Sequence, residues 1–506
     1  MQTDRRGFMW LMAGISGWLA GGGRARAGEP TWSLEIHQQT RNTRLGPVGR
    51  NWWPQRQRSR RAKEYPGRER IGLTAPAAPN ARSLGRVLRD FRSADGFANE
   101  PLDLPTLSRI LHFTNGVTGP PMLRAAPSAG ALYAGEIYLV AERIEGLEPG
   151  VYYYLPPAHA LVPIRKGSWV ETVREALERP GELGKAPAIL LLTNVFARYG
   201  RRYANRGYRY ALIDTGHIGE NLRLTARSAG LIESAPLRFH DGRLNQLLGI
   251  DGRREAVCAV HALGRPGETA RAPTVRTFRE AENAPADWGA TEQYHARSSL
   301  VEAEHRAPAR PSPLASVVRV AGEATLQPEM SVEQCVRNRR SAHRFEDRLI
   351  KRNALEWILD AALGHPALAR ASELELRLAV HRVADVDRGL YRYEQHGGPL
   401  RLLQKKDLRD PLVRTCLGQS KAGSCAAAFF LVGHLRLASE TRGSRAYRDL
   451  LIEAGAIGQR IYLAAEAIGL AARNLAAFRD DALNRLLELD GREHAVLHLT
   501  LVGREG

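Results

Sequence analysis

The chain has 506 residues, of which 43% are apolar and 25% charged, and these fractions exclude a wholly disordered or collagen-like protein. Its net charge of +19 arises from 73 lysines and arginines against 54 acidic residues, and 7 of the 73 are lysines. This charge predicts attraction to anionic surfaces or substrates, but no zinc finger, ribonucleoprotein motif or compact basic block indicates a nucleic-acid partner. The four cysteines form no CxxC pair, so we expect neither a disulfide framework nor a metal site.

The first 27 residues have the features of a twin-arginine signal peptide. Two arginines at 5–6 precede an apolar stretch at 8–20, and an A-x-A cleavage pattern follows at 25–27. A membrane anchor is the alternative, but the stretch is shorter than the roughly 20 residues that span a bilayer. We therefore expect export of a folded protein, with its cofactor, to the periplasm or the medium. No stable membrane insertion is expected after the signal is removed.

Two segments lack the patterns of a folded core. Residues 28–80 are polar and rich in arginine, which predicts an extended N-terminal arm. Residues 266–328 are rich in Ala, Pro, Arg and Glu without clear periodicity, which predicts a linker. These segments delimit two predicted domains, at 81–265 and 329–506.

The two predicted domains are copies of one unit. With a constant shift of 239 positions, 19 of 50 residues are identical between 215–264 and 454–503. The motifs LNxLL and DGR recur at the same shift. A repeat of this length indicates a duplicated domain and not a solenoid.

Each copy shows the same order of elements. In the first copy we predict an amphipathic helix around 107–111, strands at 136–141 and 188–193, a long helix at about 212–230 and a strand at 256–263. In the second copy the corresponding ranges are 355–359, 376–380, 427–433, 450–470 and 495–502. This order predicts an α+β fold with two mixed or antiparallel sheets packed by helices. Gly455 and Gly458 favour close packing of the two long helices, which would form an intramolecular pseudo-dimer.

Two stretches could bind a ligand. The basic stretch of the second copy contains Arg339, Arg340, Ser341 and His343, and guanidiniums with a hydroxyl can bind one phosphate. A solvated basic turn is the alternative. The small-residue loop of the first copy contains Pro127, Ser128, Ala129 and Gly130, and it can approach a flat ligand closely. An ordinary tight loop is the alternative. The counterparts are weaker, because Asp95 replaces the histidine in one copy and 365–370 lacks the Pro-Ser pair in the other.

Together these motifs resemble the nitroreductase fold, and most closely the SagB/ThcOx-type dehydrogenases, which include azoline oxidases. The resemblance rests on the basic stretch 339–345, the loop 127–133, the segment RGYRY at 206–210 and the LNxLL and DG motifs. It covers nearly all of 81–265 and 329–503, and the leader-like segments 35–40 and 63–66 of the arm also fit. It implies one FMN per chain between the two copies, with the basic stretch on its phosphate and the small-residue loop on its ring. It also implies that a backbone N–H of Ala476 or Ala477 lies near flavin N5. The second pseudo-site is expected to be empty.

The resemblance further implies candidate catalytic residues. Arg202 and Tyr203 match a Lys-Tyr pair of azoline oxidases, but arginine cannot act as a general base near neutral pH. Tyr203 can still act in proton transfer and Arg202 can hold an anionic substrate; structural roles are the alternative. His217 can contact flavin or substrate, or be a packed, hydrogen-bonded histidine. The second copy has Ala456 in its place, which indicates a scaffold that keeps phosphate binding.

The leading hypothesis is therefore an exported FMN-dependent oxidoreductase that transfers a hydride through flavin N5. Its substrate is a peptide or a small molecule, and a chain with its own pseudo-dimer can be monomeric. A flavin-free binding or scaffold protein with the same fold is the competing hypothesis.

Overall fold

The computed structural model describes residues 32–42, 62–74, 76, 82–90, 96–267, 275–276, 278–280, 290–302, 326–363, 373–394 and 398–506. The predicted signal peptide, the stretch 91–95 of the first copy and the loop 365–370 of the second copy lie outside these residues. Within the described part, no helix is both long enough and apolar enough to cross a membrane.

The first domain is built on a seven-stranded antiparallel sheet of order β1-β8-β7-β5-β9-β11-β10. Its strands are β1 (Ile71–Gly72), β5 (Gly135–Ala141), β7 (Gly150–Leu155), β8 (Ala160–Lys166), β9 (Ala188–Val195), β10 (Ile232–Ser234) and β11 (Glu255–Gly264). Because side chains alternate along β5, Ile137 packs with helices α4 (Leu104–Asn115) and α7 (Gly207–Ser228) on one face. Tyr138 packs with α5 (Val170–Glu175) and α8 (Asp241–Leu248) on the other.

The second domain repeats this arrangement on a six-stranded antiparallel sheet of order β16-β15-β14-β17-β19-β18. Its strands are β14 (Leu374–Val380), β15 (Gly389–Tyr393), β16 (Leu400–Gln404), β17 (Ala427–His434), β18 (Ala471–Asn474) and β19 (His494–Gly503). Helices α11 (Arg352–Leu363) and α15 (Ala446–Ala467) cover one face, and α12 (Arg409–Thr415) and α16 (Asp480–Leu486) cover the other. The predicted α+β class with two repeated domains is confirmed.

Shorter elements connect these layers. They are α3 (Leu84–Arg89), β2 (Leu102–Asp103), β3 (Val117–Gly119), β4 (Leu123–Arg124), β6 (Ile144–Glu145), α6 (Ala197–Tyr203), β12 (Phe278–Glu280), β13 (Leu300–Glu302), α10 (Val332–Asn338), α13 (Lys421–Ser424) and α14 (Leu435–Arg442). Two further short helices are α2 (Trp32–Thr40) and α9 (Ala290–Arg297).

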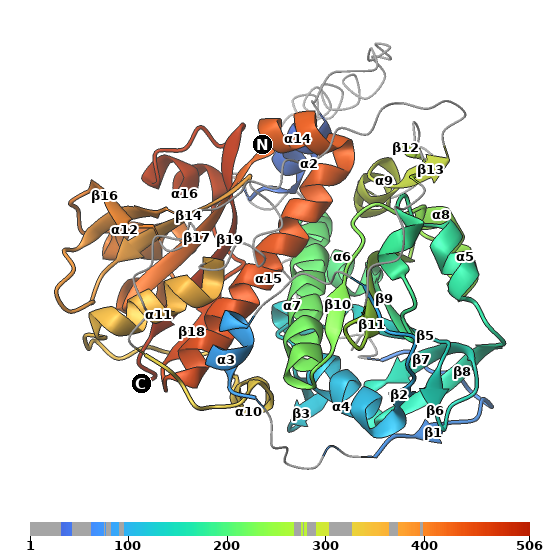
Figure 1. Cartoon of the computed structure of the whole chain (residues 1–506). Coiled ribbons are helices and arrows are strands. Elements are labelled where there is room, and N and C mark those ends of the chain that lie inside the picture. The colour runs from blue at the N-terminus through green and yellow to red at the C-terminus, as the bar shows by residue number, and fades with distance from the viewer. Residues whose placement is uncertain are drawn as a thin grey trace, which may run out of the picture.

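The long helices α7 and α15 lie side by side in the middle of the molecule (Figure 1). A Cβ atom at Gly216 would collide with the carbonyl oxygen of Ile452, and a Cβ at Gly455 would collide with that of Ile213. The two contacts are related by the same 239-residue shift, as in a two-fold interface. Gly455 therefore serves the close packing that the sequence predicts, whereas Gly458 faces the sheet of its own domain, at His498.

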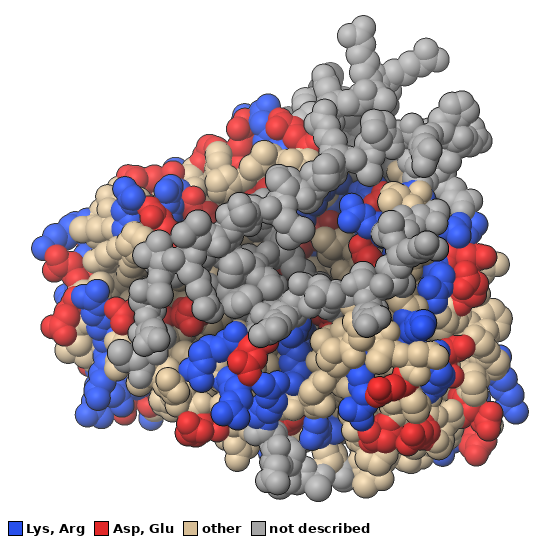
Figure 2. Space-filling model, in the orientation of Figure 1, with Lys and Arg blue, Asp and Glu red and all other residues tan. Residues whose placement is uncertain are grey.

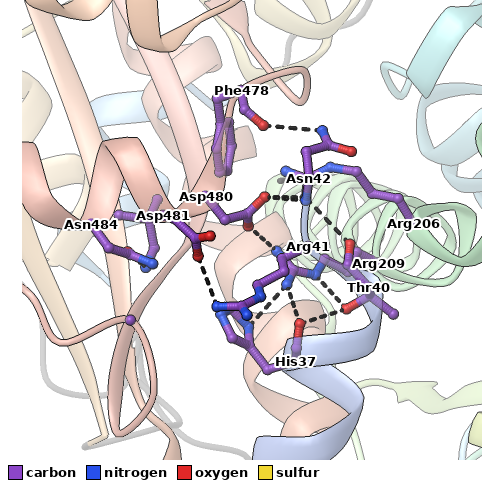
Figure 3. A network of polar contacts seen from close by, with 12 residues as sticks. His37, Thr40, Arg41, Asn42, Arg206, Arg209, Phe478, Asp480, Asp481 and Asn484 are labelled. Carbon is purple, nitrogen blue, oxygen red and sulfur yellow. Dashed lines mark hydrogen bonds and ion pairs between the residues drawn. The ribbon is translucent and has the colours of Figure 1, made fainter. Parts of the chain in front are cut away.

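A buried ion cluster joins the domains beside this crossing (Figure 3). Asp480 of the second domain accepts from Arg206 Nη1 and from Arg209 Nη1 of the first, at 2.6 Å each. Burial alone would raise the pKa of Asp480, but the two guanidiniums lower it below its ordinary value. Both arginines belong to the RGYRY segment at 206–210, so that motif serves the domain interface.

The same cluster recurs 239 residues away with the domains exchanged. Asp241 of the first domain accepts from Arg445 Nη1 at 2.8 Å and from Arg448 Nη1 at 2.7 Å, both from the second domain. Here too burial is outweighed by the guanidiniums, and the pKa of Asp241 is lowered. The interface is thus closed at both ends by a carboxylate that bridges two arginines.

Two short helices cover these clusters, in segments where we expected an arm and a linker. Helix α2 (Trp32–Thr40) is followed by Asn42, whose N–H donates to Asp480 at 2.7 Å. Helix α9 (Ala290–Arg297) precedes Leu300, whose N–H donates to Asp241 at 2.9 Å. Parts of 28–80 and 266–328 are therefore folded onto the domains. A short covering helix thus precedes each domain, at 32–40 and at 290–297.

The net positive charge is not gathered into one region of the face shown in Figure 2, where blue and red side chains alternate. Many arginines are instead used inside the molecule: Arg124, Arg209, Arg445, Arg448 and Arg460 are each 1% exposed.

We predict that Gly216→Ala destabilises the chain, because the added Cβ would force apart two helix backbones. Overpacking of this kind costs about 1–3 kcal/mol in the free energy of unfolding. Gly200→Ala is the matched control, since it also lies within a helix but its Cβ would meet no atom within 4 Å. Urea denaturation should show Gly200→Ala to be neutral or stabilising. Equal stability of both variants would argue against the close crossing.

We also predict an acid-sensitive contribution from the Asp241 cluster. Its folded pKa lies below the unfolded value, so its stabilisation is complete above about pH 4 and is lost as the pH falls through the folded pKa. Asp241→Asn should therefore cost about 3–5 kcal/mol at neutral pH, because it leaves two buried guanidiniums without a counter-charge. Denaturation at several pH values should show this difference shrinking below pH 4. A difference independent of pH would contradict the ion-pair assignment.

Candidate functional site

At the domain interface, the basic stretch contacts the segment that leads into the small-residue loop. Arg339 donates from Nε to Ala125 O at 3.3 Å and from Nη2 to Arg124 O at 3.4 Å. Arg340 donates from Nη2 to Thr118 O at 3.0 Å. The second domain thus reaches the segment that leads directly into the loop of the first, as a shared site requires.

Arg339 is a buried cation. Among the described residues, no carboxylate forms an ion pair with it. It is 5% exposed, and its recorded hydrogen bonds go to two carbonyl groups. Burial lowers the pKa of its guanidinium, because the loss of water disfavours the charged form. Among the described residues this guanidinium forms no ion pair within 4 Å, and Glu466 acts on it only from a longer distance, so a phosphate group would fit beside it.

The rest of the basic stretch follows β18. Ala342 N donates to Ala472 O at 2.9 Å, and Ser341 Oγ is 2.8 Å from the hydroxyl of Tyr462. The guanidinium of Arg339 lies 5.3 Å from the centre of the same tyrosine ring. Ser341 and Arg339 therefore converge on Tyr462, whereas His343 is exposed.

The small-residue loop is held by its own serine. Ser128 Oγ accepts from Tyr133 N at 2.9 Å and bonds the hydroxyl of Tyr199 at 2.8 Å. Ala129 N donates to Asp214 Oδ2 at 3.3 Å. The hydroxyl of Ser128 is thus used to shape the loop, and Pro127 and Ala129 remain half-buried at its surface.

Arg202 and Tyr203 lie directly against this loop. A Cβ at Gly130, whose φ is +63°, would collide with the Tyr203 hydroxyl and would lie 3.0 Å from Arg202 Nη1. Burial raises the pKa of Tyr203 to about 12, although the Arg202 guanidinium opposes this rise. At neutral pH the Tyr203 hydroxyl is therefore protonated and can donate a proton. Arg202 is exposed.

His217 is packed inside the interface. It is 2% exposed, and its Nε2 accepts from Asn474 Nδ2 of the other domain at 2.7 Å. This bond places the ring proton on Nδ1, which lies 3.7 Å from Asp214 Oδ1 and forms no hydrogen bond. His217 is therefore packed and hydrogen-bonded in this structure, as the second interpretation of the sequence expects.

Ala476 and Ala477 lie in the segment between β18 and α16. Arg206 Nη2 donates to Ala476 O at 3.1 Å, and Gln419 Nε2 donates to Ala477 O at 3.0 Å. Within the described part of the chain, no acceptor is recorded for the N–H of either alanine. These N–H groups remain able to bind a ligand.

Three residues that no motif marks connect the two halves of the site: Asp214, Tyr462 and Asn474. Asn474 N donates to the Tyr462 hydroxyl at 2.9 Å, which extends the contacts of Ser341 toward His217. A comparison of the two copies could have identified these three residues, because the copies differ there. At the 239-residue shift their counterparts differ, being Glu453, Arg223 and Ala235.

The second pseudo-site is lined by charged side chains. A cavity of about 30 Å³, which is near the volume of one water molecule, lies among Glu220, Arg223, Arg442, Asp449 and Glu453. Arg442 and Asp449 stand where the first site has Tyr203 and Tyr210. Glu220 Oε2 lies 3.2 Å from Arg460 Nη1. Among the described residues, this space is therefore narrow and lined by charged groups.

The chain resembles known proteins over both halves of this site. The profile of the Nitroreductase family matches residues 89–265 and 336–504. The nitroreductase-like protein MJ1384 of Methanocaldococcus jannaschii is 34% identical over 167 residues, which cover 33% of this chain and 84% of that protein. The Microcin B17-processing protein McbC of Escherichia coli is 30% identical over 171 residues, covering 32% of this chain and 62% of McbC, less than two thirds of its length.

A solved structure extends the likeness to the tandem arrangement. The crystal structure of a nitroreductase-like protein from Anabaena variabilis superposes with a TM-score of 0.75 at 25% identity, and the match covers 95% of this chain and 100% of that one. The relation to McbC agrees with the SagB/ThcOx-type resemblance of the sequence. With two family domains in one polypeptide, the chain belongs to the nitroreductase family.

Proposed function

We propose that the chain is an FMN-dependent oxidoreductase of the SagB/ThcOx type with one composite cofactor site between its domains. The observation that carries the proposal is the position of Arg339, a buried guanidinium without a carboxylate partner among the described residues, bonded to the segment before the small-residue loop. Membership of the nitroreductase family supports a flavin as the group that supplies both a phosphate and a flat ring.

Each half of the site would hold a different part of the cofactor. Arg339, Arg340 and Ser341 would bind the phosphate, and loop 127–130 with the backbone of 476–477 would contact the ring. When bound, FMN would supply hydride transfer at N5. Because one chain contains both halves, we propose that a monomer suffices and that the domains act as an intramolecular pseudo-dimer.

The protein's own part in the chemistry falls to Tyr203 and Arg202. The hydroxyl of Tyr203 would contact a substrate that approaches over Gly130 and would take part in the proton transfer that accompanies hydride transfer. Arg202 stays charged and would bind an anionic group of the substrate. Since McbC is a microcin B17-processing protein, we propose a peptide as substrate, and a small anionic molecule is the alternative. Export by the twin-arginine route is part of the proposal and depends on residues 1–27.

The double variant Arg339→Ala and Ser341→Ala tests the phosphate site. Loss of two bonds to a charged group, each of about 1.5–3 kcal/mol, should weaken FMN binding by roughly 100-fold or more while the fold is retained. Fluorescence titration with FMN and circular dichroism measure the two effects. Arg344→Ala is the control, because this exposed arginine belongs to the same stretch. Equal FMN affinity in the double variant and the parent would refute the assignment.

We also predict one FMN per chain. The charged lining and small volume of the second pseudo-site should exclude a second flavin. Heat release of the bound cofactor, with quantification of FMN against protein, gives the ratio. A ratio of two would refute the specialisation of the two halves.

A further inference from the structure

Three successive carbonyl groups next to the candidate site are each fixed by a side chain from a different part of the chain. The donors are Arg206 Nη2 to Ala476 O at 3.1 Å, Gln419 Nε2 to Ala477 O at 3.0 Å and Asn42 Nδ2 to Phe478 O at 3.0 Å. The Tyr210 hydroxyl also donates to Ala476 O, at 3.0 Å. The first domain, the second domain and the N-terminal segment therefore all act on one short piece of backbone.

Asp480 is the group that holds two of these donors in place. It is buried and accepts from Arg206 Nη1 at 2.6 Å and from Asn42 N at 2.7 Å, as Figure 3 shows. Arg209 Nη1 donates to its other oxygen at 2.6 Å. Removal of this carboxylate would release Arg206 and Asn42 together, and with them the carbonyls of Ala476 and Phe478.

Fixing a carbonyl also fixes the N–H of the next residue. The peptide unit is planar and trans, so the Ala477 N–H points opposite to Ala476 O. Because Arg206 and Tyr210 bind Ala476 O, the direction of the Ala477 N–H is set before any ligand arrives. A donor aimed in advance stabilises developing negative charge better than one that must first be oriented.

We propose that Asp480 is a positioning residue for the flavin. Through Arg206, which binds Ala476 O, it presets the backbone N–H of Ala477 as a hydrogen-bond donor to the ring edge that becomes electron-rich on reduction, and through Asn42 it holds the same backbone at Phe478. This role depends on the proposed FMN site. It makes the segment that follows helix α2 part of that site.

The duplication supplies an internal control. Asp241 is also buried. It accepts from the two equivalent arginines, Arg445 and Arg448, and from one backbone N–H, that of Leu300. Arg445 Nε donates to Leu237 O at 3.0 Å, as Arg206 does to Ala476 O. This cluster lies beside the small charged cavity and not beside the candidate site.

The experiment compares Asp480→Asn with Asp241→Asn in the full chain reconstituted with FMN. Both variants should lower the midpoint of thermal unfolding by similar amounts, since both leave two buried guanidiniums without a counter-charge. Only Asp480→Asn should change the flavin. We expect the equilibrium constant for its two-electron reduction to fall about tenfold, which is a shift of about 30 mV to lower potential. The visible absorption spectrum should shift in the same variant alone.

Two outcomes would overturn the positioning role. One is an unchanged potential in Asp480→Asn, and the other is an equal shift in Asp241→Asn. If Asp480→Asn does not accumulate, Tyr210→Phe removes one donor to Ala476 O without changing any charge. It should shift the potential in the same direction, and an unchanged potential there would also count against the role. A parent chain that takes up no FMN would instead overturn the proposed function itself.

Discussion

The approach of α7 to α15 is the constraint on which the rest of the molecule depends. At Gly216 and Gly455 each helix backbone touches the other, so the angle and the register of the two domains are fixed. The buried clusters around Asp241 and Asp480 then make any other register costly. A slip by one helical turn, about 5.4 Å, would leave guanidiniums and carboxylates buried apart from each other. Burial of ion pairs does not by itself add stability, but in this interface it specifies one arrangement, and the candidate site exists only in that arrangement.

The two ends of the domain interface are equivalent, but the two clefts between them differ. The clusters, the crossing glycines and the covering helices all repeat at both ends. The cleft positions do not: Asp214, His217 and Tyr462 face the interface on one side, and Glu453, Ala456 and Arg223 occupy the matching places on the other. On that second side, charged groups pair with each other across a small space, as Glu220 does with Arg460. Duplication thus kept the scaffold twice and allowed one of the two clefts to be filled by its own side chains.

The sequence allowed prediction of whatever depends on local periodicity and on repetition. The amphipathic helix around 107–111 and the strand at 188–193 are α4 and β9, because their apolar residues follow one face or one buried run. The long helix begins at Gly207 and not near 212. Arg206 at its N-cap and Arg209 in its first turn bind Asp480, which lies 274 and 271 positions away, and local periodicity does not reveal such a partner. Helices α2 and α9 were missed for the same reason: they are short and polar, and their stability comes from contacts with Asp480 and Asp241. The basic stretch contacts the segment before the small-residue loop, and only the family resemblance could predict that these two parts of the chain lie close together.

Three separate segments of the chain shape the candidate site. The chain must therefore fold before the proposed cofactor can bind there. The backbone of 476–478 is shaped by the segment after α2, by α7 of the first domain and by the second domain itself. If the proposed FMN ring binds against that backbone, a complete site requires a docked pair of domains with α2 in place. If the proposed twin-arginine signal acts, cleavage after Ala27 would leave this arrangement intact, because α2 begins at Trp32. A route that carries folded chains suits a site of this kind, since threading an unfolded chain would separate the segments that form it.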